Sequence, residues 1–187
     1  MDIHDILKLA GGVLALALFA PLLADVFRRG GAGQSFATWI LWAALDAILA
    51  VSIIQQHGNY LIVLGFAIGD GLMAAALLAK RRATWGRFET GVLLLTLGCL
   101  VTWKWSGPRV ATVAATLAIC VAGIPGLVAL WKNPDRRVAK IWAWYALSNA
   151  VAFCGGTAMT LEERFAPGAF AVYSLLLVAA GWRKPIR

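Results

Sequence analysis

Charged residues are scarce in this sequence. They make up 14% of its 187 residues, and 61% are hydrophobic, whereas a soluble domain carries about 25% charged residues. The apolar residues come in runs long enough to cross a bilayer as a helix, which takes about 20 residues. Backbone groups in lipid must be satisfied within each span, so helices are expected and an open sheet is excluded. The sequence therefore predicts an all-α polytopic membrane protein, and its Ala-rich runs with short connections favour a bacterial inner membrane.

Reactive and metal-binding motifs are also lacking. The cysteines Cys99, Cys120 and Cys154 stand alone inside apolar runs, and His4 and His57 are not paired. No CxxC, GxSxG or HExxH pattern occurs, and these are the patterns typical of redox or metal sites, hydrolases and metalloproteases. We therefore expect a protein that is not an enzyme and that has no cofactor and no metal site.

The basic residues indicate orientation and not a nucleic-acid surface. The net charge is +8, but the lysines and arginines lie in short turns between apolar runs and form no continuous stripe. Of the 17, 13 fall on the side that follows the first, third and fifth runs, which predicts an outside N-terminus and a cytoplasmic C-terminus. Asp2 and Asp5 precede Lys8, and Arg28 and Arg29 follow the first run, as in a retained span and not a cleaved signal.

Seven transmembrane helices can be placed along the chain. They cover about 6–27, 35–56, 59–80, 88–105, 109–131, 138–156 and 165–183. We expect three units: a three-helix repeat over 1–84, a linker helix over 85–107, and a second three-helix repeat over 108–187. Because both repeats would begin outside, they are parallel copies, and the linker helix restores the direction of the chain.

An internal similarity supports this division. Positions in the second and sixth runs match at a spacing of 103 residues, and a proline precedes each at a spacing of 104. The matched pairs are Pro21 with Pro125, Trp39 with Trp142, Trp42 with Tyr145, and Asp46 with Asn149. Proline breaks the hydrogen-bond ladder of a helix, so Pro21 and Pro125 are candidate hinges.

The arrangement resembles the SWEET and PQ-loop transporter family. The resemblance rests on the 3+1+3 order, the outside N-terminus, and a proline near the inner end of spans one and five. The family's glutamine after the proline is replaced by Leu22 and Gly126. The resemblance implies a transporter that works by alternating access between two three-helix repeats. In sugar-carrying members, pocket asparagines come from spans three and seven. Here span three offers Asp70, and span seven offers Tyr173 or Ser174. An acid at the position of an amide resembles the proton-coupled PQ-loop transporters, which use intramembrane aspartates.

Two acidic residues mark the expected substrate site. Asp46 and Asp70 each lie about eleven residues into a span, which at about 1.5 Å per residue is near the membrane midplane. Each costs about 2.5–3.5 kcal/mol there on insertion scales, so such acids usually serve a function. The same level holds Asn149, Tyr173 and Ser174, and Trp42 and Tyr145 lie one turn below Asp46 and Asn149. The alternative is that the two aspartates share a proton and only hold the helices together.

The sequence therefore predicts a transporter of a small polar solute. The two acids would allow this transport to be coupled to protons. The two acids favour cationic or zwitterionic solutes, and a sugar stays an alternative solute. Assembly into a homo-oligomer stays open as a separate question. A non-transporting receptor or assembly protein on the same fold is the main rival, because fold does not fix function. A retinal protein is disfavoured, because Lys184 comes only at the end of the last run.

Overall fold

The computed structural model describes residues 1–29, 35–81 and 85–184. Within these ranges the chain is helical and contains no strand. The elements are α1 Ile3–Ala17, α2 Phe19–Arg29, α3 Phe36–Gln55, α4 Leu61–Ala79, α5 Arg87–Ala122, α6 Ile124–Lys132, α7 Arg136–Gly155, the π-helix η1 Leu161–Phe165, and α8 Ala166–Trp182. The all-α class predicted from the sequence is confirmed.

Polar side chains begin several of the helices. Asp2 accepts a hydrogen bond from the backbone of Asp5, which in turn accepts one from the backbone of Asp2, so that the two form a capping box at α1. Ser35 caps α3, and Asp135 caps α7. Each cap satisfies a backbone N–H that has no partner within its helix.

The prolines and one glycine interrupt the longer helices. α1 ends at Ala17, four residues before Pro21, where the missing N–H of proline leaves a carbonyl without its partner. α5 likewise ends at Ala122, and Pro125 lies in the first turn of α6. Within α5, Gly107 has φ 81° and ψ 177°, a backbone conformation favoured by glycine that divides this element into two helices.

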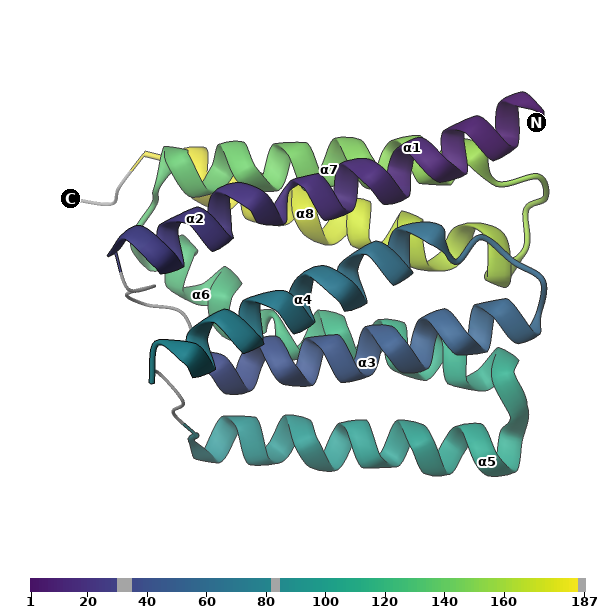
Figure 1. The fold of residues 1–187 in the computed structure, drawn as a ribbon, viewed down its shortest axis with the longest axis horizontal. Coiled ribbons are helices and arrows are strands. Elements are labelled where there is room, and N and C mark those ends of the chain that lie inside the picture. The colour runs from purple at the N-terminus through teal and green to yellow at the C-terminus, as the bar shows by residue number, and fades with distance from the viewer. Residues whose placement is uncertain (30–34, 82–84, 185–187) are drawn as a thin grey trace.

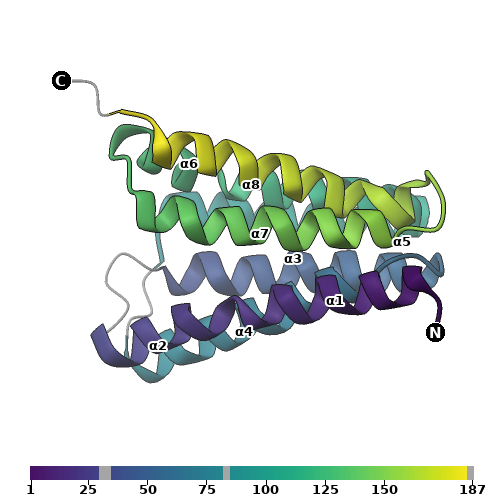
Figure 2. The same cartoon turned by 90° about the horizontal axis from the view of Figure 1, so that it is seen from above.

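The helices lie side by side along the long axis of the molecule (Figure 1). In the first part of the chain α4 packs against both α1 and α3, and in the second part α8 packs against α6 and α7. The two parts meet where α1 contacts α7 and where α3 contacts α5. Seen from above, α1, α2 and α4 lie on one side of the molecule and α6, α7 and α8 on the other (Figure 2).

We call the end of the bundle that holds residue 1 the N-terminal end. It also holds the connections 56–60 and 156–160 and the break at Gly107, whereas α8 ends at the opposite end (Figure 1). Close packing there depends on glycines: a Cβ on Gly12 would lie 2.8 Å from the carbonyl oxygen of Leu61, and one on Gly65 would lie 2.8 Å from that of Gly12. Small residues thus let the backbones of α1 and α4 approach.

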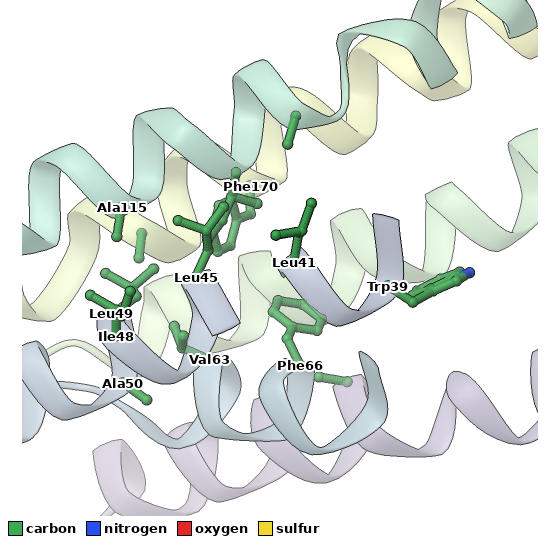
Figure 3. Packing of buried hydrophobic residues seen from close by; sticks show 14 of the residues in the cluster. Trp39, Leu41, Leu45, Ile48, Leu49, Ala50, Val63, Phe66, Ala115 and Phe170 are labelled. Atoms are coloured by element: carbon green, nitrogen blue, oxygen red, sulfur yellow. The ribbon is translucent and has the colours of Figure 1, made fainter. Parts of the chain in front are cut away.

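The buried core consists mainly of apolar side chains from α3 and α4 and their neighbours. Figure 3 shows Leu45 and Leu49 of α3 packed with Val63 and Phe66 of α4 and Ala115 of α5. Leu45, Leu49 and Val63 are fully buried. This packing fixes the rotation of α3 and α4, and with it the direction in which their polar residues point.

The outer surface is apolar as well. Five helical segments in the described part of the chain are long and apolar enough to cross a membrane: Ile3–Arg28, Phe36–Gln55, Leu61–Ala79, Arg87–Lys132 and Leu161–Trp182. Large hydrophobic side chains on these segments are exposed, among them Leu94, Val172 and Leu175. A surface of this kind is compatible with an integral membrane protein, because exposed apolar patches of this extent are rare on soluble monomers.

Candidate functional site

Two aspartates meet in the interior of the bundle. Asp46 of α3 and Asp70 of α4 are only 3% and 4% exposed, and their carboxyl groups lie close enough to interact directly. Oδ1 of Asp46 is buried, and no N–H or O–H group of the described residues donates to it.

The packing of α2 on α4 covers this pair. Phe19, the first residue of α2, is 2% exposed, and its ring lies against Gly69, where a Cβ would come within 2.1 Å of Cδ2. Because Gly69 immediately precedes Asp70, the absence of a side chain here lets an aromatic ring close over the backbone next to the acid. The GxxxG spacing of Gly65 and Gly69 therefore serves contact with α1 and α2.

Aromatic rings from both parts of the chain meet at Tyr145. Its ring centroid is 5.1 Å from that of Trp142, 5.6 Å from Phe66 and 6.0 Å from Phe19. Tyr145 is 6% exposed and lies close enough to Asp70 and Asp46 to feel their charges. The aromatic cluster thus connects the acids of α3 and α4 with α7.

Asn149 lies one turn beyond Tyr145 on the same face of α7. It is 1% exposed, and its Nδ2 donates to the backbone oxygen of Tyr145 at 2.8 Å. Oδ1 of Asn149 is buried without a partner, as is Oδ1 of Asp46. The two positions that match in the internal repeat therefore each present one unpartnered buried acceptor.

The other residues of the predicted site, Trp42, Tyr173 and Ser174, lie only partly within this cluster. The Trp42 ring packs edge-on against Trp39 at 5.5 Å, and its Nε1 is buried without a partner. Tyr173 donates its hydroxyl to the backbone oxygen of Gly123 at 2.7 Å, next to the break before Pro125. Ser174 is 2% exposed.

Sequence reasoning did not assign Phe19, Phe66 or Cys120 to this region. Phe19 and Phe66 contact Tyr145 directly, and Cys120 of α5 lies near Asp46 and Tyr173. The signal for Phe19 lay in the glycine spacing of α4, since its ring fits against Gly69, where a side chain is missing. Phe66 and Cys120 carried no such signal.

The N-terminal end of the bundle is held together by polar contacts between the two parts of the chain. Nζ of Lys8 lies 3.0 Å from Oε2 of Glu163 in η1, and the side chains are 16% and 9% exposed. Asn59 donates its side-chain amide to the backbone oxygen of Ala152 at 2.8 Å and its backbone N–H to the oxygen of Glu162 at 3.0 Å. These contacts join α1 and the connection after α3 to the region between α7 and α8.

An apolar cleft lies elsewhere on the molecule. It has a volume of about 650 Å³ and runs along α8 and η1; Cys120, Phe153, Arg164 and Tyr173 are among the residues that line it. Its lining is almost entirely apolar, and neither Asp46 nor Asp70 belongs to it. Where the chain is described, no group of three or more His, Cys, Asp or Glu side chains is arranged to hold a metal ion.

The two helices that carry the acids contain no basic side chain. α3, α4 and α8 contain no lysine or arginine, and those of α7 stand in its first five residues, at Arg136, Arg137 and Lys140. The candidate site therefore combines two carboxyls and several aromatic rings on helices whose lysines and arginines lie away from the two acids.

No family model matches this sequence, and neither a characterised protein nor a solved structure matches it significantly.

Proposed function

We propose that the protein is a membrane transporter that moves a small polar solute by alternating access, with Asp46 and Asp70 at the substrate site. The observation that carries this proposal is the pair of buried aspartates on two adjacent apolar helices, α3 and α4. Acids inside membrane-spanning helices are costly, and they usually line a substrate or proton path. Contact between two acids could also hold two helices together, and exchange measurements on amide variants separate the two roles.

Seven membrane spans are the topology that fits this function. The segment Arg87–Lys132 has 46 residues, about twice the length needed to cross a bilayer, and Gly107 breaks it near the middle. α7 is also long enough, with 20 residues, and packs lengthwise against α1 and α8. Residue 1 and the end of α8 lie at opposite ends of the bundle (Figure 1), as an odd number of spans requires.

The packing of the helices supports a 3+1+3 division. In this division α1 with α2 corresponds to the second half of α5 with α6, α3 corresponds to α7, and α4 corresponds to α8. The contacts of α4 with α1 and α3 then have counterparts in those of α8 with α5 and α7. The contact of α1 with α7 has its counterpart in that of α5 with α3. Such a pairing is what two related units around a common axis would produce.

Alternating access requires one end to close while the other opens. The ion pair of Lys8 and Glu163 and the bonds of Asn59 close the N-terminal end, which the positive-inside rule assigns to the outside. The helix breaks before Pro21 and Pro125 divide the corresponding spans nearer the other end. Breaks at matched positions suit hinges, because the lost hydrogen bonds let a helix bend there.

Flux in proteoliposomes tests the proposal. Liposomes that contain the purified protein are loaded with unlabelled candidate solutes. Entry of a labelled solute is then measured for the native chain and for Asp46→Asn. Solute exchange that depends on Asp46 is the expected result. Binding without exchange would instead indicate a receptor on this fold.

A further inference from the structure

We propose that the apolar cleft along α8 and η1 binds an anionic phospholipid, with an acyl chain in the cleft and the phosphate group at Arg164. The cleft has a volume of about 650 Å³, and Arg164 is the one charged side chain among the described residues that line it. This inference goes beyond transport, since the lining contains neither Asp46 nor Asp70.

The cleft has the length and the exposure that a lipid chain requires. Its lining residues from η1 and α8 form a row along the helix: Arg164, Phe165, Gly168, Ala169, Val172, Tyr173 and Leu176. The helical rise from the first to the last of them is about 18 Å, close to one leaflet of a hydrocarbon core about 30 Å thick. Val172 and Leu176 are 60% and 51% exposed, and α8 lies at the outer edge of the bundle (Figure 2). The cleft therefore opens on the apolar outer surface, where lipid chains lie in a membrane.

The walls of the cleft suit a hydrocarbon chain better than a polar solute. Gly168 and Ala169 present little or no side chain, and a Cβ on Gly168 would already lie 3.2 Å from Cε2 of Phe153 on α7. The hydroxyl of Tyr173 is engaged by the backbone oxygen of Gly123 at 2.7 Å. A polar solute would therefore leave most of its hydrogen-bonding groups without partners here, which is costly.

Arg164 is fixed at the end of the cleft that lies nearest the N-terminal end of the bundle. Its guanidinium carbon lies 4.9 Å from the ring centroid of Phe153. Its Nε donates to the backbone oxygen of Ala158 at 3.1 Å, and its Nη2 donates to that of Gly156 at 2.8 Å. A guanidinium group has five N–H donors, so donors are left for the oxygens of a phosphate group, which arginine binds with two parallel hydrogen bonds.

Charge complementarity identifies the occupant. In the part of the chain that the structure describes, no carboxylate forms an ion pair with Arg164, and the neighbouring Glu163 is paired with Lys8 at 3.0 Å. An arginine at the end of an apolar helix lies at the level of the lipid head groups, where anionic lipids supply negative charge. One cation at the end of an apolar cleft one leaflet long matches a phospholipid. A free phosphate ion would use the cation without the cleft, and a neutral lipid the cleft without the cation.

Four ligands separate the head group from the chains. Dioleoyl phosphatidylglycerol is anionic, dioleoyl phosphatidylcholine keeps the phosphate in a neutral head group, dioleoylglycerol has no phosphate, and glycerophosphate has no chains. Binding to the delipidated protein in detergent is measured by native mass spectrometry over a titration of each ligand. We expect phosphatidylglycerol to bind about fivefold or more tightly than phosphatidylcholine or dioleoylglycerol. Glycerophosphate should not bind at the same concentrations.

Two variants, each with a matched control, locate the site. Arg164→Gln removes the charge, so the preference for phosphatidylglycerol over dioleoylglycerol should be lost. Arg109→Gln, at an exposed position next to the break at Gly107, should keep the native preference. Ala169→Trp fills the cleft and keeps the hydrogen bonds of Arg164, and it should weaken the binding of every lipid about fivefold or more. Ala179→Trp, at an exposed position of α8 outside the cleft, should bind as the native protein does.

Several results would overturn the inference, and none of them depends on transport. Equal affinity for phosphatidylglycerol and dioleoylglycerol, or a native preference in Arg164→Gln, would show that Arg164 binds no lipid phosphate. Unchanged lipid affinity in Ala169→Trp would show that the chains lie outside the cleft. Glycerophosphate bound as tightly as the lipid would indicate a site for free phosphate. A dimer of the native protein that dissociates in Ala169→Trp would show that a second copy of the chain fills the cleft.

Discussion

Lys8 and Glu163 join the first helix of the chain to the turn that precedes its last helix. Nζ of Lys8 lies 3.0 Å from Oε2 and 3.1 Å from Oε1 of Glu163, and Oε2 of Glu163 also accepts from the backbone N–H of Thr157 at 3.3 Å. Glu163 belongs to the π-helix η1, a form often found at functional positions. In the alternating-access cycle that we propose, the N-terminal end opens only when this ion pair breaks.

Removal of this ion pair should destabilise the closed state. We expect Glu163→Gln to lower the free energy of unfolding by about 2 kcal/mol, because it leaves the largely buried ammonium of Lys8 without its counter-charge. Lys8→Met in the same protein should cost less than it does alone, and the four unfolding curves of this double-mutant cycle in detergent give the coupling. Lys104→Met, at an exposed position of α5, is the control. Additive losses would show that the ion pair contributes nothing.

The contact of Phe19 with Gly69 gives a second test. A methyl group at Gly69 would collide with the Phe19 ring, whereas a Cβ on Gly71 of the same helix would meet no atom within 4 Å. We therefore expect Gly69→Ala to destabilise the protein by about 1–3 kcal/mol and Gly71→Ala to be neutral or stabilising. Thermal unfolding of the two variants in detergent measures the difference. Equal melting temperatures would mean that α2 can move away from α4 without loss.

α3 and α4 were predictable because each is a single apolar run with a clear boundary, whereas the runs predicted over 6–27 and 109–131 are each divided into two helices. The helix predicted over 35–56 is observed at Phe36–Gln55, and the one predicted over 59–80 at Leu61–Ala79. Ser35 and the short polar connection after Gln55 define these limits in the sequence itself. The break at Gly107 also falls within the connection predicted between 105 and 109.

The approach of Asp46 to Asp70 was predictable only in part. Counting residues along two spans put Asp46 and Asp70 at one level, but their rotation toward each other depends on how α3 packs on α4, which hydropathy does not encode. The bonds of Asn59 and the pair of Lys8 and Glu163 join positions distant in the sequence. Such contacts arise only from the arrangement of the two parts of the chain.

The prolines should affect exchange more than stability. Pro21→Ala and Pro125→Ala each restore a backbone N–H and so permit a continuous helix, which would favour one state over the other. A bias of about 1.4 kcal/mol changes the ratio of two states about tenfold, so we expect slower solute exchange in proteoliposomes and little loss of melting temperature. Pro167→Ala, in the first turn of α8, is the control. If the double variant exchanged solute at the native rate, both helix breaks would be static bends and not hinges.

Chemical labelling tests the proposed topology. In a protein with its native cysteines replaced, single cysteines at the exposed positions His57 and Met159 should react with an impermeant reagent only from outside. Cysteines at Lys80 and Lys132, also exposed, should react only from the cytoplasm. Intact cells and inverted vesicles provide the two sides. Reaction of any one position from the wrong side would contradict the orientation and the seven spans together.

Amide replacement of the two aspartates separates a transport site from a structural contact. Asp46→Asn and Asp70→Asn each keep a side chain of the same size that can still bond to the remaining carboxyl. Each also relieves the cost of an acid in the bundle interior, so the melting temperature should be unchanged or higher. Solute exchange should nevertheless fall about tenfold or more, because only one carboxyl remains and the pair can no longer hold a proton and a negative charge together. A loss of melting temperature in step with the loss of exchange would show that the pair only holds α3 and α4 together.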